Sequence, residues 1–273
     1  MSTAHLLLTR FNVRRGPETD ARALSLEWLN HRLALFAGVT VPSVLAQTRR
    51  PDQWLIFLDE QTPPEFRTAL DRCLACLPWV RQVYCAALDT AALTETIAPC
   101  LPSQVDWLLT TRLDNDDALH PEFIATVQAM VSPGHREFLN PRHGLIVTDG
   151  RLYRKQDLSS PFITLSEPVA GFRTVWLDQH QRLANHGPIR QFGLKDAWVQ
   201  VVHGGNLANQ VRGLRVHGRS VLHGVLPLSL AREVRPLAMP AWIADNTIGL
   251  VKRYAGSGWR RLRRELADLR VRT

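Results

Sequence analysis

Continuous apolar runs alternate with segments of helical periodicity along the first half of the chain. The runs predict strands at residues 5–9, 52–60, 81–85 and 107–109. Apolar residues spaced three and four apart, with a proline pair opening one segment, predict helices at 20–36, 42–47, 63–77, 90–97 and 118–128. This order predicts an α/β fold, with a largely parallel central sheet that has helices on both faces.

The second half of the chain has shorter strand candidates separated by turn residues, at 137–140, 144–148, 151–155, 161–165 and 197–202. Asp149-Gly150 is typical of a two-residue hairpin turn. We expect this half to extend the sheet with antiparallel strands and to shape a second pocket. Because no linker interrupts the pattern, one α/β/α sandwich domain is predicted over residues 1–240. Its halves are 1–132 and 133–240, and residues 241–273 form a tail.

Composition fits a globular protein, since 273 residues with an apolar fraction of 45% can fill a sizeable core. No stretch is long and apolar enough for a secretory signal or a spanning helix, so a cytoplasmic location is expected. The formal net charge is +8. Residues 250–273 hold eight basic and two acidic side chains, which leaves the remaining residues at +2. Nucleic acid is therefore not expected as a partner.

The tail has an apolar stripe surrounded by arginines. Trp259, Leu262, Leu266 and Leu269 recur at helical spacing, and arginines fill most of the other positions between 259 and 270. This pattern predicts a basic amphipathic helix, which is typical of proteins that bind an anionic membrane surface or a partner's groove. We expect residues 259–270 to place the protein peripherally on the inner membrane. The alternative is an ordinary helix packed on its own domain.

Four cysteines include one CxxC pair, Cys73 and Cys76. Cys73 falls on an apolar stripe with Phe66 and Leu70, and Cys76 lies beside that stripe. We therefore expect both thiols to be buried in a helix rather than to bind zinc or form a redox pair.

Four acidic or amide residues, 114–117, follow the fourth apolar run through Arg112. Carboxylates at the end of a buried parallel strand point into the crevice above the sheet, and in an extended segment Asp114 and Asp116 share one face. These oxygen donors predict a hard-cation site. A calcium loop is excluded, because its sixth and twelfth positions would be Leu119 and Ala125. The structural alternative is an acidic cap of the next helix.

Other strand ends are polar as well. Arg10 and Asn12 follow the first strand, and Asp59 ends the second. Arg112 faces the same side as Asp114, where it either pairs with the acids or holds a phosphate. No glycine-rich phosphate loop follows any strand, which disfavours a dinucleotide or P-loop site.

Taken together, these motifs resemble the GT-A glycosyltransferases, and most closely a bacterial family of rhamnosyltransferases. The matching segments are LLLTRFNVR (6–14), PSVLAQT (42–48), WLIFLDEQTP (54–63), TTRLDNDDALHPEF (110–123), SPFITLSEP (160–168) and WVQVVHGGNLAN (198–209). The tail has no part in the resemblance.

The resemblance implies a DxD motif at Asp114 and Asp116. Asp116 would bind Mn²⁺ or Mg²⁺ directly, Asp114 would serve the ribose or reach the ion through water, and Asp117 could do either. The ion would act as a Lewis acid on the leaving diphosphate. GT-A enzymes often add a late histidine, for which His203 is expected because it ends a predicted strand before two glycines. Its rivals are His180, His217 and His223.

Further roles follow from the same resemblance. Arg10, Asn12 and Asp59 would touch the base and ribose, with Arg112 and Asp114 alongside. An inverting transfer also needs a general base near the acceptor hydroxyl. The expected base is Glu167, after the apolar run SPFITLS, and the open alternatives are Asp178 and Asp196.

The implied function is a metal-dependent, inverting glycosyltransferase of cell-envelope polysaccharide synthesis. It would move a sugar, rhamnose by the family's name, from a nucleoside-diphosphate donor to a glycan or lipid-linked acceptor. A sugar-nucleotide pyrophosphorylase is disfavoured, because residues 10–15 replace its glycine-rich loop. The remaining alternative is a nucleotide-binding α/β protein without catalysis, whose basic tail binds membrane or nucleic acid.

Overall fold

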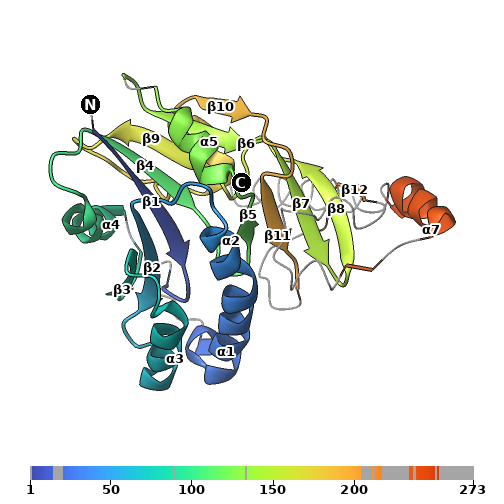
Figure 1. Ribbon diagram of the computed structural model, residues 1–273, viewed down its shortest axis with the longest axis horizontal. Helices are drawn as coiled ribbons and strands as arrows, with labels where there is room; N and C mark the ends of the chain where they lie inside the picture. Colours follow the sequence, from blue (N-terminus) through green and yellow to red (C-terminus); the bar gives the residue numbers. More distant parts are fainter. Residues whose placement is uncertain are drawn as a thin grey trace, which may run out of the picture.

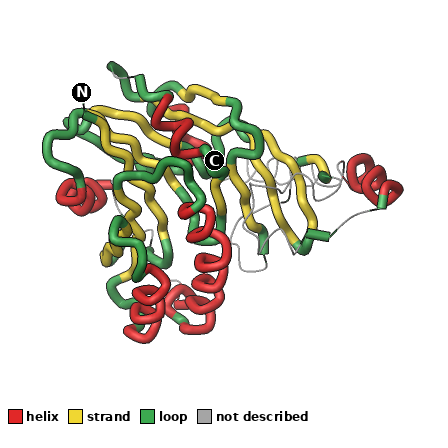
Figure 2. The backbone as a smooth tube through the Cα atoms, in the orientation of Figure 1, coloured by secondary structure: helices red, strands yellow, loops and turns green. Residues whose placement is uncertain are grey.

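Two β-sheets lie side by side in the computed structural model (Figures 1 and 2). The structure describes residues 2–14, 21–88, 90–132, 134–203, 211, 213–216, 234–235, 238–249 and 251. The larger sheet has the strand order β10-β6-β9-β4-β1-β2-β3. Its strands are β1 (Thr3–Arg10), β2 (Gln53–Asp59), β3 (Val80–Cys85), β4 (Trp107–Arg112), β6 (Glu137–Pro141), β9 (Thr164–Pro168) and β10 (Ile189–Phe192).

The centre of the larger sheet is parallel, as predicted. β1 pairs in parallel with β2 and β4, and β2 pairs in parallel with β3. The register sets Leu8 opposite Arg112 and Arg10 opposite Phe57, so these strands end at the same edge. β9 joins β4 in the antiparallel direction. The predicted α/β class with a largely parallel sheet and an antiparallel extension is therefore confirmed.

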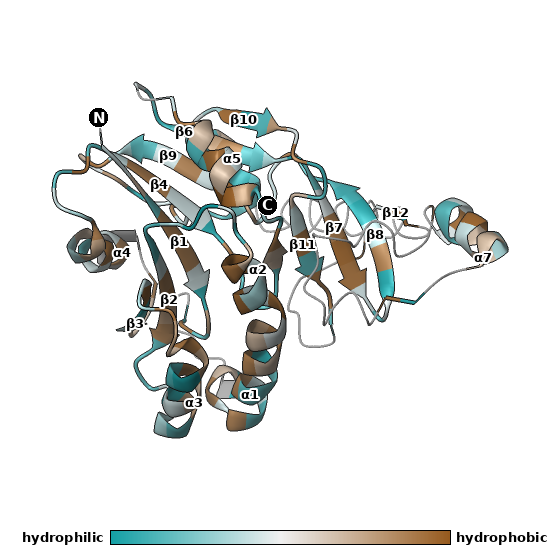
Figure 3. Ribbon diagram, viewed as in Figure 1, coloured by the Kyte–Doolittle hydropathy of each residue, from teal (hydrophilic) through white to brown (hydrophobic). Residues whose placement is uncertain are grey.

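Helices cover both faces of this sheet (Figure 1). Leu7 and Trp54 pack on one face with residues of α1 and α3, whereas Leu6 and Leu55 pack on the other with residues of α4. The central strands are thus buried on both sides, which explains their continuous apolar runs (brown in Figure 3). The helices among the described residues are α1 (Leu26–Leu35), α2 (Val41–Leu45), α3 (Pro64–Leu74), α4 (Thr90–Ile97), α5 (Phe123–Ala129) and α7 (Met239–Ala244).

The second sheet has the order β12-β8-β7-β11-β5. Its strands are β5 (Ala118–Leu119), β7 (His143–Thr148), β8 (Arg151–Gln156), β11 (Trp198–Val201) and β12 (Leu214–Arg215). Asp149 and Gly150, with φ of 47° and 72°, turn β7 into β8, which confirms the predicted hairpin. The prediction that all these strands extend the first sheet is wrong. Pro141 ends β6, and the chain enters a separate sheet with its own core around Leu145 and Val199.

Several helix boundaries differ from the predicted ones. The helix expected from residue 118 begins at Phe123, because β5 pairs with β11 instead. α1 continues into α2 through a π-helical segment, η2 (Phe36–Thr40), just before Pro42, which lacks a backbone N–H. Cys76 lies beyond the end of α3 and is exposed, so the prediction that both thiols are buried is wrong for Cys76, whereas Cys73 is partly buried.

The C-terminal tail is described only up to residue 251, so the predicted helix at 259–270 lies outside the described residues. The described part contains α7 and a following π-helical turn, η6 (Asp245–Gly249). No described helix is long and apolar enough to cross a membrane. Among the described residues, short 3₁₀ segments lie at η1 (Ala21–Leu24), η3 (Ala98–Cys100) and η4 (His180–Asn185).

Candidate active site

The acidic cluster 114–117 lies at the edge where β1, β2 and β4 end. The backbone N–H of Leu113 still bonds the Leu8 carbonyl at 3.0 Å, and the chain then turns, with Asp117 N donating to the Asp114 carbonyl at 3.3 Å. This segment is a turn rather than an extended strand. The expected alternation of faces therefore does not hold, since Asn115 and Asp116 contact the same side chain, Arg32.

Asp116 and His203 meet across 87 residues of sequence. His203 follows β11, and its Nε2 lies 3.1 Å from Asp116 Oδ2. Both side chains are largely buried, with exposed fractions of 16% for His203 and 4% for Asp116. The structure thus brings the expected histidine to the expected carboxylate.

The donor set at Asp116 and His203 fits a divalent ion. Two ligands that lie about 2.1 Å from one octahedral ion at a right angle are roughly 3 Å apart, which matches the 3.1 Å between Oδ2 and Nε2. An oxygen and an imidazole nitrogen also suit Mn²⁺. Within the described part of the chain, no group of three acidic, histidine or cysteine side chains is arranged to hold a metal. A bound ion would therefore take its remaining ligands from water or from donor phosphates.

Asp114 is held by Arg112. Arg112 Nη2 donates to both carboxylate oxygens, at 2.8 and 3.1 Å, and Nε donates to Oδ1 at 3.2 Å. Asp114 remains the more exposed partner, at 29% against 11% for Arg112. Of the two expected roles of Arg112, the structure contains the ion pair.

Asp117 is buried and contacts the end of β11. Its Oδ1 accepts from the backbone N–H of Val201, the last residue of β11, at 2.9 Å. Burial raises the pKa of Asp117 well above its usual value, and the nearby charges of Asp116 and Asp114 add to that effect. Asp117 therefore fixes the end of β11, two residues before His203.

Two of the expected nucleotide-binding residues, Asn12 and Asp59, are joined by a hydrogen bond. Asn12 Oδ1 accepts from the backbone N–H of Asp59 at 3.2 Å, and its Nδ2 donates to Thr62 Oγ1 at 3.0 Å. Asp59 is fully buried, and its Oδ2 accepts from Arg14 Nε at 2.7 Å. Arg10 is partly exposed at the end of β1. Arg10, Asn12, Arg14 and Asp59 thus lie at the same edge of the sheet as the acidic cluster.

Glu167 does not join this edge. It lies in β9 opposite Leu108, near the start of β4, whereas the acidic cluster follows the end of β4. The carboxylate is fully buried and accepts from Arg136 Nε at 2.9 Å and from the Thr174 backbone N–H at 2.9 Å. Burial raises its pKa, and the backbone bonds of Arg173 and Thr174 oppose that shift. The position gives no support to Glu167 as the general base.

The alternative bases are also engaged elsewhere. Asp178 Oδ2 is 2.9 Å from His186 Nε2 on the surface. Asp196 accepts from Arg154 at 2.8 and 3.0 Å, and it lies at the opposite end of β11 from His203.

Of the rival histidines, His180 lies among the described residues. His180 is held by its Nδ1 against the Ser159 carbonyl, and burial lowers its pKa. His217 and His223 lie outside the described residues.

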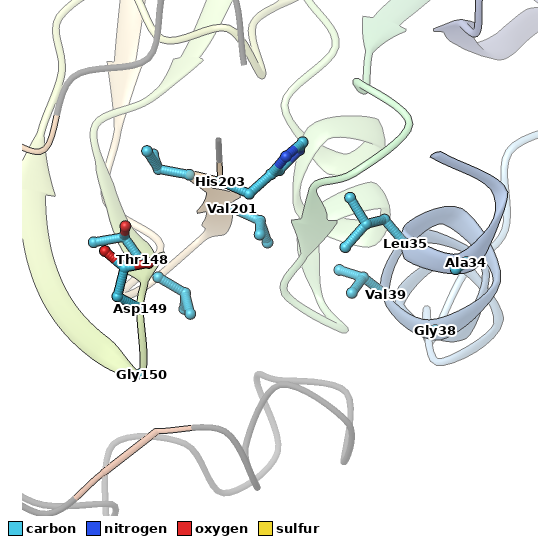
Figure 4. Close-up of a pocket in the computed structure, with 11 residues that line it drawn as sticks. Ala34, Leu35, Gly38, Val39, Thr148, Asp149, Gly150, Val201 and His203 are labelled. Atoms are coloured by element: carbon cyan, nitrogen blue, oxygen red, sulfur yellow. The ribbon is translucent and has the colours of Figure 1, made fainter. Parts of the chain in front are cut away.

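A cavity of about 310 Å³ opens beside His203 (Figure 4). One wall is the end of α1 with η2, and the opposite wall combines the β7–β8 turn with the end of β11. Most of the lining is apolar, whereas His203, Thr148 and Asp149 are polar. The lining residues are Ala34, Leu35, Gly38, Val39, Val147, Thr148, Asp149, Gly150, Val201, Val202 and His203.

Comparison with known families identifies the chain. Residues 6–215 match the family described as "Putative rhamnosyl transferase". The chain belongs to this family. The match runs from within β1 to the end of β12 and includes both Asp116 and His203. The resemblance seen in the sequence is thereby confirmed, and the protein is a member of a glycosyltransferase family.

Solved structures show distant likeness. TarS residues 1–349 from S. aureus, in complex with UDP-GlcNAc, match with a TM-score of 0.41 and 11% identity, over 78% of this chain and 62% of that one. A protein described as a "putative nucleotide-diphospho-sugar transferase" from Desulfovibrio desulfuricans matches with a TM-score of 0.37 and 10% identity, over 74% of this chain and 83% of that one. The rhamnosyl transferase family member described here therefore spans less than two thirds of that TarS fragment. No curated protein matches the chain.

Sequence reasoning missed Arg32 and the pairing of Arg14. Arg32 lies on α1, 84 residues before Asp116. Because its apolar neighbours Leu29 and Leu33 dominate the helical pattern, nothing in the local sequence marks Arg32 as a site residue. Arg14 belongs to a basic stretch after β1, and only the parallel pairing of β1 with β2 brings it to Asp59.

Proposed function

We propose that this family member is a metal-dependent glycosyltransferase that moves a sugar, rhamnose by its family, from a nucleoside-diphosphate donor to a glycan or lipid-linked acceptor. The observation that supports the metal is the contact of Asp116 with His203 at the carboxyl edge of the parallel strands. That edge is where open α/β sheets bind nucleotides.

In this proposal Asp116 and His203 hold a Mn²⁺ or Mg²⁺ ion, which supplies the positive charge that stabilises the leaving diphosphate. Asp114, fixed by Arg112 and partly exposed, accepts from a ribose hydroxyl or from ion-bound water. Arg14 and Asp59 keep the end of β2 rigid, so that Asn12 and Arg10 border the base. No general base is assigned.

The cavity beside His203 is proposed as the acceptor side. Its size is within the range of small-ligand sites, and His203 borders both the cavity and Asp116. Apolar walls at Leu35 and Val39 suit the hydrophobic face of a sugar ring, while Thr148 and Asp149 offer oxygen atoms to hydroxyl groups.

A thermal unfolding experiment tests the donor and metal part of the proposal. Mn²⁺ together with UDP, dTDP or GDP should raise the melting temperature of the wild-type protein, because a ligand that binds only the folded state stabilises it. The Asp116→Asn protein should lose that response. Asp178→Asn removes a surface carboxylate away from the site and should keep it. The absence of a shift with every nucleoside diphosphate would contradict the proposal.

Transfer is tested separately from binding. Metal-dependent hydrolysis should be measured over a panel of nucleotide-sugars, with Asp116→Asn as the inactive comparison. Binding without hydrolysis or transfer of any donor would favour the non-catalytic alternative.

We further propose that the C-terminal part of the protein contacts an anionic membrane surface. Trp242, Asp245 and Asn246 fasten α7 and η6 to β8 and β12 through hydrogen bonds to Tyr153 and Arg215. Exposed apolar side chains occupy other positions of the same segment. They are Met239, Ile243, Ile248 and Val251, between 51% and 68% exposed.

In this segment, polar side chains bond to the protein and apolar side chains face outward, which is the reverse of the usual amphipathic pattern. The segment lies at one end of the molecule (Figures 1 and 3), and residues 252–273 that follow it carry eight basic and two acidic side chains. Apolar side chains next to a strongly basic stretch are complementary to anionic lipid.

A further inference from the structure

A guanidinium group lies between the side chains that are proposed to hold the ion. Arg32 Nη1 donates to Asp116 Oδ2 at 2.8 Å and is 3.0 Å from His203 Nε2. Its Nη2 donates to Asn115 Oδ1. Arg32 comes from α1, so a helix that follows β1 supplies a positive charge at the end of β4.

The contacts of Arg32 are incomplete for a purely structural ion pair. Nη1 of Arg32 donates to the Asp116 carboxylate, whereas both Nε and Nη2 of Arg112 donate to Asp114. Within the described part of the chain, the buried Nε of Arg32 has no hydrogen-bond partner. Since two-nitrogen forks are the stronger arrangement, Arg32 is the more easily displaced of the two arginines.

The Nε2 atom of His203 lies within hydrogen-bond distance of a donor and an acceptor at the same time. If Nε2 accepts from Arg32, it faces the Asp116 oxygen at 3.1 Å as a second acceptor. If Nε2 carries the proton and donates to Asp116, it faces an N–H of Arg32 instead. One nitrogen cannot satisfy both neighbours. A small cation between Nε2 and Oδ2 removes the conflict, because both atoms then act as electron-pair donors.

We propose that Arg32 is an internal counter-ion, which neutralises Asp116 while no divalent ion is bound and competes with that ion for the site. Arg32 also has a second contact that does not depend on Asp116, since its Cζ lies 5.6 Å from the centre of the Trp28 ring, one helical turn earlier. When the ion displaces the guanidinium from Asp116, the contact with Trp28 keeps it near the site, where it can pair with a bound diphosphate. The competition between Arg32 and the ion rests on the metal site of the proposed function, but it does not require a bound sugar donor.

Binding of Mn²⁺ alone tests this inference, with free Mn²⁺ followed by electron paramagnetic resonance in titrations of the full chain. Arg32→Gln should bind Mn²⁺ about tenfold more tightly than wild type, because removal of the guanidinium removes its competition for Asp116, and couplings between two binding events typically change affinity by ~5–150-fold. Arg32→Lys keeps the charge and should stay near wild type. Arg154→Gln removes an arginine that pairs with Asp196, away from the site, and should leave the affinity unchanged.

An equal or weaker Mn²⁺ affinity in Arg32→Gln, with a circular dichroism spectrum like that of wild type, would overturn the inference. So would the absence of Mn²⁺ binding in both proteins, since removal of the counter-ion should open the site. A purely structural Arg32 would lower the melting temperature of the variant without tighter binding. Failure of the proposed function would instead appear as no response to any nucleoside diphosphate, while the Mn²⁺ comparison could still be made.

Discussion

Neighbouring residues of the acidic cluster differ in what surrounds them. Asp114 faces Arg112 and solvent, Asp116 faces Arg32 and His203, and Asp117 faces the backbone of β11. The sequence alone leaves these roles open, because a turn allows each side chain its own direction. The contacts favour Asp116 as an ion ligand and Asp117 as a support for the strand that precedes His203.

Asp117→Asn tests that division. Asparagine keeps an oxygen that can accept from Val201 N–H and removes the buried ionisable group. Since the folded-state pKa of Asp117 is raised, its ionised form opposes folding at neutral pH. The variant should therefore be as stable as wild type or more stable at pH 7, and it should keep the thermal response to Mn²⁺ with UDP. Loss of that response as complete as in Asp116→Asn would assign Asp117 to the ion.

A second prediction concerns His5, a buried residue of β1. Burial lowers the pKa of His5 to about 3, and its Nε2 is 2.7 Å from Thr111 Oγ1. The unfolded chain binds a proton on His5 below pH 6.5, but the folded chain does not until about pH 3. Lowering the pH from 6.5 toward 3 therefore reduces the free energy of unfolding, and this group contributes up to ~1.4 kcal/mol per pH unit to the loss.

The His5→Gln protein lacks this proton-linked term. The stability difference between wild type and His5→Gln should shift in favour of the variant by ~2 kcal/mol between pH 7 and pH 5. Urea unfolding at the two pH values measures it. Identical pH slopes for the two proteins would contradict the assignment.

At the scale of elements, strands buried on both faces were the most predictable feature. β1, β2 and β4 coincide with the continuous apolar runs, because burial on both faces leaves no polar alternation. The strand ends then placed Asp59 and residues 114–117 at one edge. β5 and β10 were not predicted, since their two and four residues take strand form through pairing with distant partners.

The position of His203 depends on packing that has little local signal. Trp198 of β11 is fully buried, stacks on Phe162 at 4.9 Å and donates to the Pro141 carbonyl at 2.9 Å. Gly144 of β7 lies so close that an added Cβ would be 2.0–2.3 Å from the Trp198 ring. The glycine is thus required by the approach of an aromatic ring.

Gly144→Ala should therefore displace Trp198 and with it β11. We expect a loss of at least ~1–3 kcal/mol in unfolding free energy, as for other overpacked cores, together with a weaker thermal response to Mn²⁺ and UDP. Gly193→Ala is the matched control, because a Cβ there meets nothing within 4 Å. Chemical denaturation measures the first effect, and equal stability of the two variants would contradict it.

At the scale of the whole molecule, the sequence predicted one sheet and the structure contains two. Turn residues and alternating patterns were visible from residue 137 on, but nothing local distinguishes a strand that extends one sheet from a strand that begins another. The junction arises where β5 leaves the acidic cluster and pairs with β11. That crossing creates the site, since it brings His203 to Asp116 from the second sheet.

The membrane proposal also belongs to the whole molecule, because it joins α7 to the basic residues after it. Wild type should sediment with vesicles of phosphatidylglycerol and phosphatidylcholine, and much less with phosphatidylcholine alone. Replacement of Ile243 and Ile248 by serine should lower the partition coefficient by about a hundredfold or more, since each buried isoleucine contributes ~1.5–3 kcal/mol. Because both side chains are exposed, the melting temperature should not change. Leu158→Ser, at an exposed leucine outside the segment, is the control.

Removal of residues 252–273 should abolish the preference for anionic vesicles. Unchanged sedimentation of the double variant would show that the exposed apolar positions of α7 and η6 do not meet lipid, and equal binding to neutral vesicles would contradict the charge argument.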